Sequence, residues 1–475
     1  MKGLTQELID FVMGIHFEDL PLDVVHETKR LFLDSIGVGI AALKTDKGRY
    51  AMALANRFGG PPESAILGTK HRVACGHAAF ANGELINAMD YDANFFPTHA
   101  PPSVIPASLA LGETVRATGK EIILSIALAC ELSLRLGIAI RGLKKIFPSE
   151  EGSEVGKIVG TKNSVSAVGV VVIAGTTSAG RILKIDQQKM AHAVGLAVHF
   201  TPFPQAKWRF TPRMSMAKYV SAGWASMGEV TAVLLAEMGY QADTTTLDGP
   251  LGFWRFFGSD RWDPEILTEK LGREWKILKA VEYKPYPCCR DFHVALDCLM
   301  KIIDENNLTP EEIEKVQIQT HPAVTQPSHM TKQILDHMDA QFSLPYCIAA
   351  AAYRVNLPEW QDPDRIKEPK ILRFMDKVFS DAHPQFFEVQ RAEPGSNMTT
   401  VEVTARNKTF KEEGKFARGF SHLDFAKMTD EDLVKKFRMN ASRALPKNKV
   451  DKAVARLMEL EKVETISEVV KQVTL

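Results

Sequence analysis

The densest run of small and apolar residues, between positions 74 and 140, constrains the fold of this chain most. Alanine, leucine and glycine dominate it, and side chains of this size let helices approach one another closely. Apolar periodicity predicts further helices before and after this run. Residues 1–271 are therefore expected to form the first part of a helical domain. Its other predicted helices are 5–13, 21–42, 46–58, 165–183, 187–197 and 215–238.

The composition changes after Leu271, where short β-type runs alternate with helical ones. Residues 272–420 are predicted to form a smaller α+β domain. Its strands are expected at 275–281 and 316–320, its helices at 291–306 and 340–353, and a hairpin at 387–390 and 399–404. Helical patterns return at 429–445, 449–461 and 466–473, so residues 421–475 should complete the helical domain. The predicted fold is mostly α, with an inserted α+β domain.

Charge and cysteine usage exclude several classes of protein. Lys plus Arg and Asp plus Glu are equal at 58 each, so no net field attracts nucleic acid or anionic lipid. Six cysteines in a chain without an apolar N-terminal h-region are expected to be reduced thiols. The apolar stretches 121–140 and 165–180 are interrupted by charged or small polar residues and fit buried helices better than membrane spans. The expectation is a cytoplasmic protein with no nucleic-acid or membrane partner.

The stretch 82–103 combines a helix end with several polar groups. Asp90 and Asp92 lie where the helix should end, and His99 follows an aromatic pair. Two prolines then interrupt any continuing helix, and Ser103 is a candidate N-cap for a helix over 104–117. Such a helix N-terminus would suit an anionic ligand. The alternative for both aspartates is helix termination and solvent contact.

Three later clusters carry candidate functional residues, each with an ordinary structural alternative. Lys218 is flanked by small and apolar residues and could be a lysine that extends its ammonium to solvent. The proline-rich loop from Lys284 to His293 contains Cys288 and Cys289, and no base that would activate Cys289 is visible. Tyr346 begins an apolar helix and could be a core tyrosine.

Together these clusters resemble the MmgE/PrpD family, whose members include 2-methylcitrate dehydratases, cis-aconitate decarboxylases and an iminodisuccinate epimerase. The resemblance rests on four motifs in family order. They are Met89-Asp90-Tyr91-Asp92-Ala93-Asn94 followed by His99-Ala100-Pro101, the lysine at 218, Lys284-Pro285-Tyr286-Pro287-Cys288-Cys289, and Gln341-Phe342-Ser343-Leu344-Pro345-Tyr346. The chain departs from the family pattern at Ala93, Asn94 and Cys289, and it has no histidine before the 165–183 helix.

The resemblance implies roles for these residues. Lys218 and Lys284 would bind substrate carboxylates and stabilise an enolate-like dianion. His99 would be the general acid/base, with Asp90 orienting it or exchanging a proton itself. Substrate contacts are expected from four further residues: Asn94, Tyr346, Cys289 and His293. The resemblance also implies a large all-helical domain with a smaller α+β lid domain, and a homodimer built through the helical domain.

The predicted function is a cofactor-independent lyase, a dehydratase or decarboxylase similar to 2-methylcitrate dehydratase, acting on a small di- or tricarboxylic acid. The sequence contains no Walker loop, no His-Glu-x-x-His and no zinc-type cysteine spacing, so neither a cofactor nor a metal is expected. One alternative is an epimerase or racemase of an acidic amino or imino acid. A non-catalytic helical binding protein is the alternative from another class.

Overall fold

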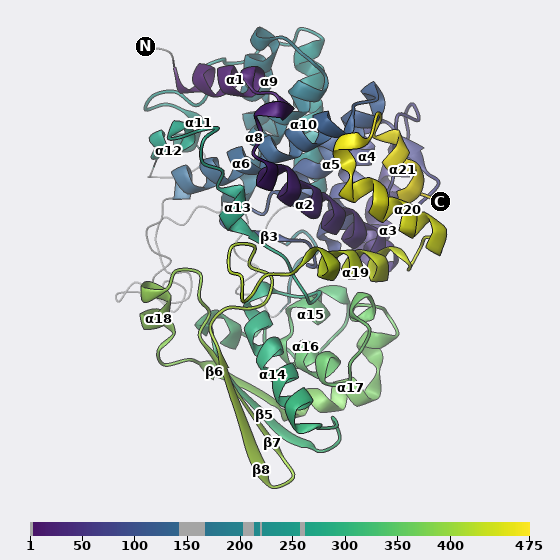
Figure 1. The fold of residues 1–475 in the computed structure, drawn as a ribbon, viewed down its shortest axis with the longest axis vertical. Coiled ribbons are helices and arrows are strands. Elements are labelled where there is room, and N and C mark those ends of the chain that lie inside the picture. Colours follow the sequence, from purple (N-terminus) through teal and green to yellow (C-terminus); the bar gives the residue numbers. More distant parts are fainter. Residues whose placement is uncertain (1–2, 142–166, 203–212, 219–220, 257–261) are drawn as a thin grey trace.

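The computed structural model describes residues 3–141, 167–202, 213–218, 221–256 and 262–475. Figure 1 shows a larger helical part and a smaller part that contains a sheet. The longer helices of the larger part are α1 (Leu4–Gly14), α2 (Leu22–Ala41), α3 (Asp46–Phe58), α4 (Cys75–Ala88), α5 (Pro101–Val115), α6 (Gly119–Arg141), α8 (Val171–Ile182), α9 (Gln187–Phe200) and α10 (Ala222–Glu237). Its short elements are β1 (Ser64–Ala65), β2 (Arg72–Val73), β3 (Asn94–Phe95), α11 (Phe253–Phe256), α12 (Glu265–Thr268), α13 (Ile277–Ala280) and β4 (Val281–Glu282).

The smaller part holds a four-stranded sheet in the order β6-β5-β7-β8, with β5 and β6 parallel and the other pairs antiparallel. The chain then returns to the larger part through three helices. The elements of the smaller part are α14 (His293–Asn306), β5 (Ile313–Thr320), α15 (His337–Phe342), α16 (Leu344–Ala352), α17 (Pro369–Phe374), β6 (Val378–Ala382), α18 (Phe386–Ala392), β7 (Thr399–Ala405) and β8 (Lys408–Gly414). The returning helices are α19 (Asp430–Ala441), α20 (Lys447–Met458) and α21 (Ser467–Val473).

Two hydrophobic cores correspond to these two parts. The larger core takes side chains from α1 to α10 and from α19 to α21, and the smaller core lies between the sheet and α14, α16 and α17. The predicted fold class, mostly α with an inserted α+β domain, is confirmed. The boundaries placed at 271/272 and 420/421 stay predictions.

Close helix packing in the larger part depends on glycine where α4 crosses α10. A Cβ on Gly83 would lie 2.8 Å from the Gly223 Cα, and a Cβ on Gly223 would lie 2.2 Å from the Phe80 carbonyl oxygen. Neither position can therefore carry a side chain without the helices moving apart. The crossing brings the end of α4, and the loop that follows it, beside the segment before α10.

Several predicted elements are wrong in extent or type. The helix after Asp90 begins at Pro101 rather than after Ser103, because prolines are tolerated in the first helical turn. Its first two residues consequently lack N–H donors, which removes the predicted anion-binding helix terminus. Residues 277–280 are helical instead of extended, and the Ile277 N–H donates to the buried Glu131 carboxylate at 3.0 Å.

Other corrections concern helices that tertiary contacts interrupt. The helix predicted over 215–238 begins only at Ala222, after the Ser221 N-cap, so Lys218 lies in a turn. The helix predicted over 340–353 is divided at Ser343, whose hydroxyl donates to the Thr331 carbonyl and caps α16. Asp291 lies within a short 3-10 turn and caps nothing, since α14 begins at His293 without a side-chain cap.

The predicted hairpin is also wrong. Residues 387–390 belong to helix α18, and β7 pairs instead with β8 and β5. The β7–β8 turn consists of Arg406 and Asn407, both with positive φ, and this pair lacks the glycine that usually marks such a turn. Residues 141–163 lose the apolar periodicity of a helix and are predicted to form a loop, which lies outside the described residues from 142 onward.

Helix α6 is the one described helix that is long and apolar enough to cross a membrane by length and composition. Within the most apolar 18-residue window of this segment, Gly119–Ile140, 94% of the residues are buried inside the protein. Its Glu131 and Arg135 form an internal ion pair at 2.6 Å. These contacts are those of a core helix.

Candidate functional site

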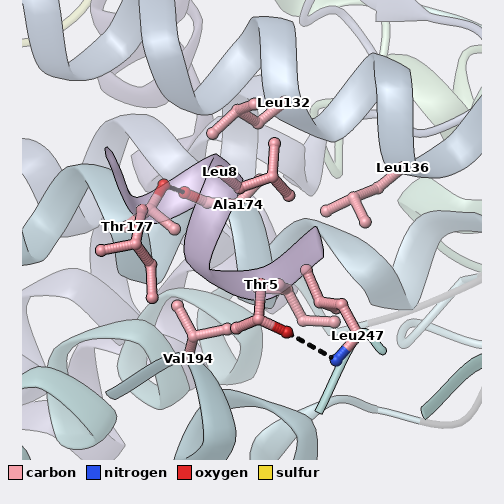
Figure 2. A pocket seen from close by; sticks show the side chains of 10 residues that line it. Thr5, Leu8, Leu132, Leu136, Ala174, Thr177, Val194 and Leu247 are labelled. Carbon is pink, nitrogen blue, oxygen red and sulfur yellow. Dashed lines mark hydrogen bonds between the residues drawn. The ribbon is translucent and has the colours of Figure 1, made fainter. Parts of the chain in front are cut away.

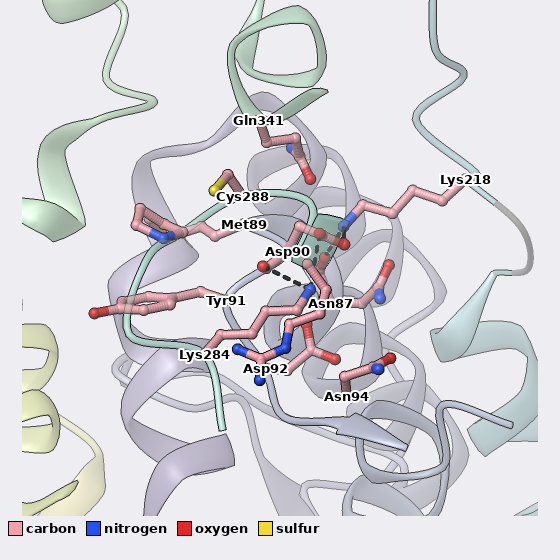
Figure 3. A network of polar contacts seen from close by, with 12 residues as sticks. Asn87, Met89, Asp90, Tyr91, Asp92, Asn94, Lys218, Lys284, Cys288 and Gln341 are labelled. Atoms are coloured by element: carbon pink, nitrogen blue, oxygen red, sulfur yellow. Dashed lines mark hydrogen bonds and ion pairs between the residues drawn. The ribbon is translucent and has the colours of Figure 1, made fainter. Parts of the chain in front are cut away.

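The carboxylate of Asp90 lies between two buried lysine ammonium groups. Its Oδ1 is 3.0 Å from the Lys218 Nζ, and its Oδ2 is 2.8 Å from the Lys284 Nζ. The Lys218 Nζ also donates to the Asn87 carbonyl at 2.6 Å, and the Lys284 Nζ to the Asp90 carbonyl at 3.0 Å. Figure 3 shows both lysine side chains converging on Asp90 from different segments of the chain. We call this group the two-lysine cluster: Asp90, Lys218 and Lys284.

Local structure explains how each member reaches the cluster. Asp90 directly follows the C-cap of α4, where the chain turns in the left-handed region. Strand β3 pairs antiparallel with β4, with Asn94 opposite Glu282, and Lys284 follows β4 by two residues. Lys218 ends a turn in which its N–H donates to the Ser215 carbonyl at 2.9 Å. A strand pair and two turns therefore bring distant segments together.

Three predicted catalytic residues have positive φ although none is glycine: Asp90 at 53°, His99 at 89° and Lys218 at 50°. This conformation is disfavoured for L-residues with a Cβ, and it persists only where surrounding contacts impose it. Strained backbone of this kind concentrates at functional sites. Its presence at two members of the two-lysine cluster, Asp90 and Lys218, and at His99 supports a functional role for these residues.

His99 is paired with Asp92 rather than with Asp90. The His99 Nε2 lies 3.1 Å from the Asp92 Oδ2, and the Asp92 side chain is fully buried. Asp92 thus makes the carboxylate contact with His99 that the prediction gave to Asp90, and the role of Asp90 stays a prediction. The alternative of solvent exposure is wrong for both aspartates, since Asp90 and Asp92 are 3% and 0% exposed.

Burial and neighbouring charge perturb the ionisation of the site. Burial would raise the pKa of Asp90, but the Lys218 and Lys284 ammonium groups hold it well below its ordinary value. Burial lowers the pKa of Lys218 to about 8 despite Asp90, whereas Asp90 and Asp92 outweigh burial and raise the pKa of Lys284. Burial also lowers the pKa of His99 to about 4, against the opposing effect of Asp92. At neutral pH the protein thus presents an ionised Asp90 and a neutral imidazole.

Two further buried lysines surround the cluster, each with its own carboxylate. The Lys436 Nζ lies 2.7 Å from the Asp34 Oδ1 and donates to the Tyr91 carbonyl at 2.8 Å. The Lys47 Nζ lies 3.0 Å from the Glu84 Oε2. We call these two pairs the matched ion pairs. Lys436 connects α19 to α2 and to the loop after α4, and Lys47 connects α3 to α4.

The predicted substrate contacts have different surroundings. The Asn94 amide donates to the Glu282 carboxylate at 3.1 Å. Cys289 packs beside Met214, Met338 and Phe342, and burial raises the pKa of its thiol well above the ordinary value. That shift disfavours a thiolate nucleophile.

His293 and Tyr346 make backbone contacts in the smaller part. His293 is buried, with its Nε2 3.3 Å from the Cys288 carbonyl oxygen. The Tyr346 hydroxyl donates to the Trp360 carbonyl within the smaller core. The structure therefore brings Asp90, Lys218 and Lys284 into direct contact, and it pairs His99 with a neighbouring aspartate. The roles assigned to all eight predicted residues stay predictions.

Sequence reasoning missed several residues that hold the loop after α4. The amide of Gln361 donates to the Met89 and Pro287 carbonyls, at 2.7 Å each, and that of Gln341 to the Ala88 carbonyl at 3.1 Å. Lys436 could have been found, because it interrupts the apolar stripe of α19 between Leu433 and Phe437. No comparable signal marks Gln361, which lies in a loop.

A small cavity elsewhere in the larger part does not resemble a binding site for an acid. It measures about 10 Å³, lies between α1 and helices α6, α8 and α9, and is lined by apolar side chains and two threonines. Figure 2 shows Thr5, whose hydroxyl oxygen accepts a hydrogen bond from the Leu247 N–H at 3.0 Å. This volume holds at most about one water molecule, and no charged group faces it.

In the described part of the chain, neither the cysteines nor the other possible metal ligands form a further candidate site. All six cysteines are free. Within the described ranges, no group of three or more His, Cys, Asp or Glu side chains could hold a metal ion. The expectation of a protein without metal or cofactor stays a prediction.

Comparison with known proteins identifies relatives along nearly the whole chain. Residues 6–265 match the MmgE/PrpD N-terminal domain, and residues 286–460 match the MmgE/PrpD C-terminal domain. The cis-aconitate decarboxylase of Homo sapiens is 24% identical over 98% of this chain and 94% of its own length. The cis-aconitate decarboxylase of Aspergillus terreus is 24% identical over 81% of this chain and 79% of its own length. Since the two domain models together cover most of the sequence in family order, the chain belongs to the MmgE/PrpD family.

Proposed function

We propose that the protein is a lyase that acts on a small tricarboxylic acid, with loss of CO2 as the reaction. The two-lysine cluster is the observation that carries this proposal. Two buried ammonium groups share one carboxylate there, so a substrate carboxylate can supply the missing negative charge. Charge interactions are strong where water is excluded, and a cationic pocket of this kind favours a polyanion. The named relatives, which are decarboxylases of a tricarboxylate, support the choice of reaction.

The cluster suits the charge that develops during such a reaction. Cleavage of the bond to CO2 leaves an electron pair on carbon, which delocalises into a remaining carboxylate as an enolate-like dianion. Lys218 and Lys284 stabilise that dianion, because both ammonium groups are already fixed by Asp90 and need no reorganisation. One proton then replaces the lost CO2 on carbon.

His99 is the proposed donor of that proton. In the free protein its imidazole is neutral, since burial lowers its pKa to about 4. An entering polyanion raises the pKa of the imidazole and favours the imidazolium form. Asp92, at 3.1 Å, stabilises that form and orients the ring. Asp90 stays ionised and acts as the positioning residue for both lysines.

Two departures from the family pattern bear on which acid is bound. Ala93 is fully buried beside Asp92, and Asn94 uses its amide to contact Glu282. Neither residue presents the carboxylate or hydroxyl of the family pattern. The side chains at these two positions, which could select one tricarboxylate over another, therefore differ in chemistry from those of the family pattern.

Proton NMR in D2O tests the proposal, with cis-aconitate, citrate, 2-methylcitrate and substituted succinates as substrates. Loss of CO2 with one deuterium incorporated per turnover, from cis-aconitate or a related tricarboxylate, is the expected result. Elimination of water from 2-methylcitrate would instead establish a dehydratase, and exchange with inversion would establish an epimerase. No reaction with any acid would favour the non-catalytic alternative.

A matched variant tests the role of His99 in the same assay. His99→Gln keeps a polar side chain of similar size but cannot donate from an imidazolium, so turnover should fall by about 10²- to 10⁴-fold. Circular dichroism of the variant controls for folding. A folded and fully active His99→Gln variant would remove His99 from the mechanism.

The homodimer, which the family resemblance implies, is also a proposal. Light scattering of the purified protein tests it.

A further inference from the structure

His337 is a buried histidine that the proposed mechanism does not use. It is the first residue of α15 and is 3% exposed. Neither of its ring nitrogens has a hydrogen-bond partner in the described part of the chain. The Asp336 side chain cannot satisfy them, because its carboxylate caps the helix through the Met338 and Asp339 N–H groups at 2.8 and 3.1 Å. A buried polar side chain without partners is uncommon and costs stability. Its presence therefore suggests a role other than stabilising the fold.

Helix α15 is joined directly to the segment that carries Lys218. Arg213, five residues before that lysine, contacts Asp336 at 2.7 Å and Asp339 at 2.9 Å. Between the two segments, Met214 packs against Met338 and Phe342. The Lys218 ammonium itself lies 5.9 Å from the centre of the Phe342 ring. The start of α15 is thereby joined to the segment that carries Lys218, and its last residue, Phe342, lies beside the Lys218 ammonium.

The same helix contacts the loop that carries Asp90. The amide of Gln341, four residues after His337, bridges the His337 and Ala88 carbonyls at 3.1 Å each. Figure 3 shows Gln341 on the same side of Asp90 as Lys218. Both ends of α15 are thus anchored to segments that form the cluster, which makes it a rigid support for a side chain that contacts substrate.

Burial and four nearby charges, one of them Lys218 of the two-lysine cluster, set the ionisation of His337. Burial is the main reason that its pKa falls to about 4, and the Lys218 and Lys47 ammonium groups lower it further, against Asp336 and Asp46. At neutral pH the ring is therefore uncharged, with one N–H donor and one acceptor nitrogen. The N–H of the neutral His337 ring can donate a hydrogen bond to an anionic oxygen that Lys218 also binds.

We propose that His337 is a further substrate-binding residue, which donates a hydrogen bond to a carboxylate of the acid held by Lys218 and Lys284. This inference rests on the proposed function, because it requires a carboxylate ligand at the two-lysine cluster. Among the described residues the buried ring nitrogens have no hydrogen-bond partner, and the ligand supplies the missing acceptor. Hydrogen bonds to charged groups are stronger than neutral ones, so the contact should contribute measurably to affinity.

Binding of propane-1,2,3-tricarboxylate, measured by calorimetry, tests the inference. This probe carries three carboxylates but has no double bond or hydroxyl group to react. His337→Leu should weaken its binding by roughly 10- to 100-fold, since a hydrogen bond to a charged group is lost. His337→Gln keeps an N–H donor and should recover part of the affinity. His383→Leu is the control, because His383 is also buried but contacts Thr400 and Gln385 in the distant sheet.

Two further readouts separate a binding role from a structural one. The thermal midpoint of ligand-free His337→Leu should equal or exceed that of the wild type, because the substitution removes polar atoms that have no partner. The wild-type His337 ring nitrogens, assigned by comparison with His337→Gln, should shift in ¹⁵N NMR when the probe is added. If His337→Leu fails to fold, the ring shift and the His337→Gln affinity decide the question.

The outcomes distinguish this inference from the proposed function. Wild-type affinity in His337→Leu, or ring signals that do not respond to the probe, would overturn the role of His337 alone, provided that the wild type turns over a tricarboxylate. If the wild-type protein neither binds the probe nor converts any acid, the proposed function fails and the inference fails with it.

Discussion

The two-lysine cluster and the matched ion pairs differ in how their charges are balanced. Lys436 and Lys47 each contact a separate buried carboxylate, Asp34 or Glu84. Lys218 and Lys284 share the single carboxylate of Asp90. Burying a charge is costly unless it is paired, so the matched ion pairs are complete as they stand. Among the described residues, the two-lysine cluster has one more cation than it has anions in direct contact, which supports the proposal that an anionic substrate binds there.

The largest expected effect comes from removing a cation from the two-lysine cluster. Lys284→Met should lower kcat by on the order of 10³-fold, because an interaction that stabilises the developing charge is lost. The protein should stay folded, since Asp90 keeps its contact with Lys218. Steady-state kinetics with the substrate found by NMR, together with circular dichroism, check this. A Lys284→Met variant with wild-type kcat would contradict the assignment of the cluster as the active site.

Breaking a matched ion pair should change stability much more than catalysis. Lys436→Met leaves the Asp34 carboxylate buried without its cation and should cost about 3–5 kcal/mol of unfolding free energy. The double variant Lys436→Met/Asp34→Leu removes both charges and should recover most of that loss. Urea denaturation of the wild type, both single variants and the double variant measures the coupling. A double variant as unstable as Lys436→Met would show that the pair has a role beyond mutual neutralisation.

Because the buried imidazole of His99 is neutral, we expect the unfolding free energy to decrease in acid. Burial places the folded-state pKa of His99 near 4, below the ordinary value of 6.5 that applies to the unfolded chain. Below pH 6.5 the unfolded chain therefore binds a proton that the folded protein does not. Stability should fall as the pH decreases from 6.5 to about 4, by up to about 3 kcal/mol from this residue.

Urea denaturation at pH 7, 6, 5 and 4 tests the acid effect, with His99→Gln as the comparison. The variant should show a shallower decline than the wild type between pH 6.5 and 4. Identical pH profiles for the two proteins would mean that His99 is already protonated in the folded state, which would change its proposed role.

The smallest expected effect concerns positive φ outside the site. Arg116 is exposed and has a φ of 57° at the C-cap of α5, close to the values at Asp90 and Lys218. Arg116→Gly should raise the unfolding free energy by about 0.5–1 kcal/mol, since glycine adopts this conformation without a steric penalty. Thermal denaturation and the kinetic assay should show higher stability with unchanged activity. Lower stability would show that strain is not the dominant factor at this position.

Helices α3 and α19 show how far local sequence signals are reliable. Helix α3 has the predicted bounds, because the Thr45 N-cap and Gly59 with positive φ specify both of its ends. Thr429 and Asp432 form a capping box at the start of α19, a signal that the sequence carries locally. The start of α10 could not be located in this way, because positive φ at Lys218 delays the helix until the Ser221 cap.

Short apolar runs were the least reliable signal. Residues 277–280 and 387–390 have no periodicity long enough to separate a strand from a helix. Their helical conformation depends on contacts with distant residues. The Ile277 N–H is bound by Glu131, and Phe386 at the start of α18 packs against His321 with ring centres 4.5 Å apart.

The family, the fold class and the residue types of the candidate site follow from the amino-acid sequence alone. Asp90, Asp92 and His99 occur within ten residues, so a local motif was sufficient to find them. The contacts of the folded chain were needed to show that Asp90 faces two lysines while Asp92 faces the histidine. The two lysine contacts of Asp90 join residues 128 and 194 positions apart, and the contact of Lys436 with Tyr91 joins residues 345 apart. Helix and turn signals act over a few residues, whereas the balance of buried charges depends on packing between distant segments.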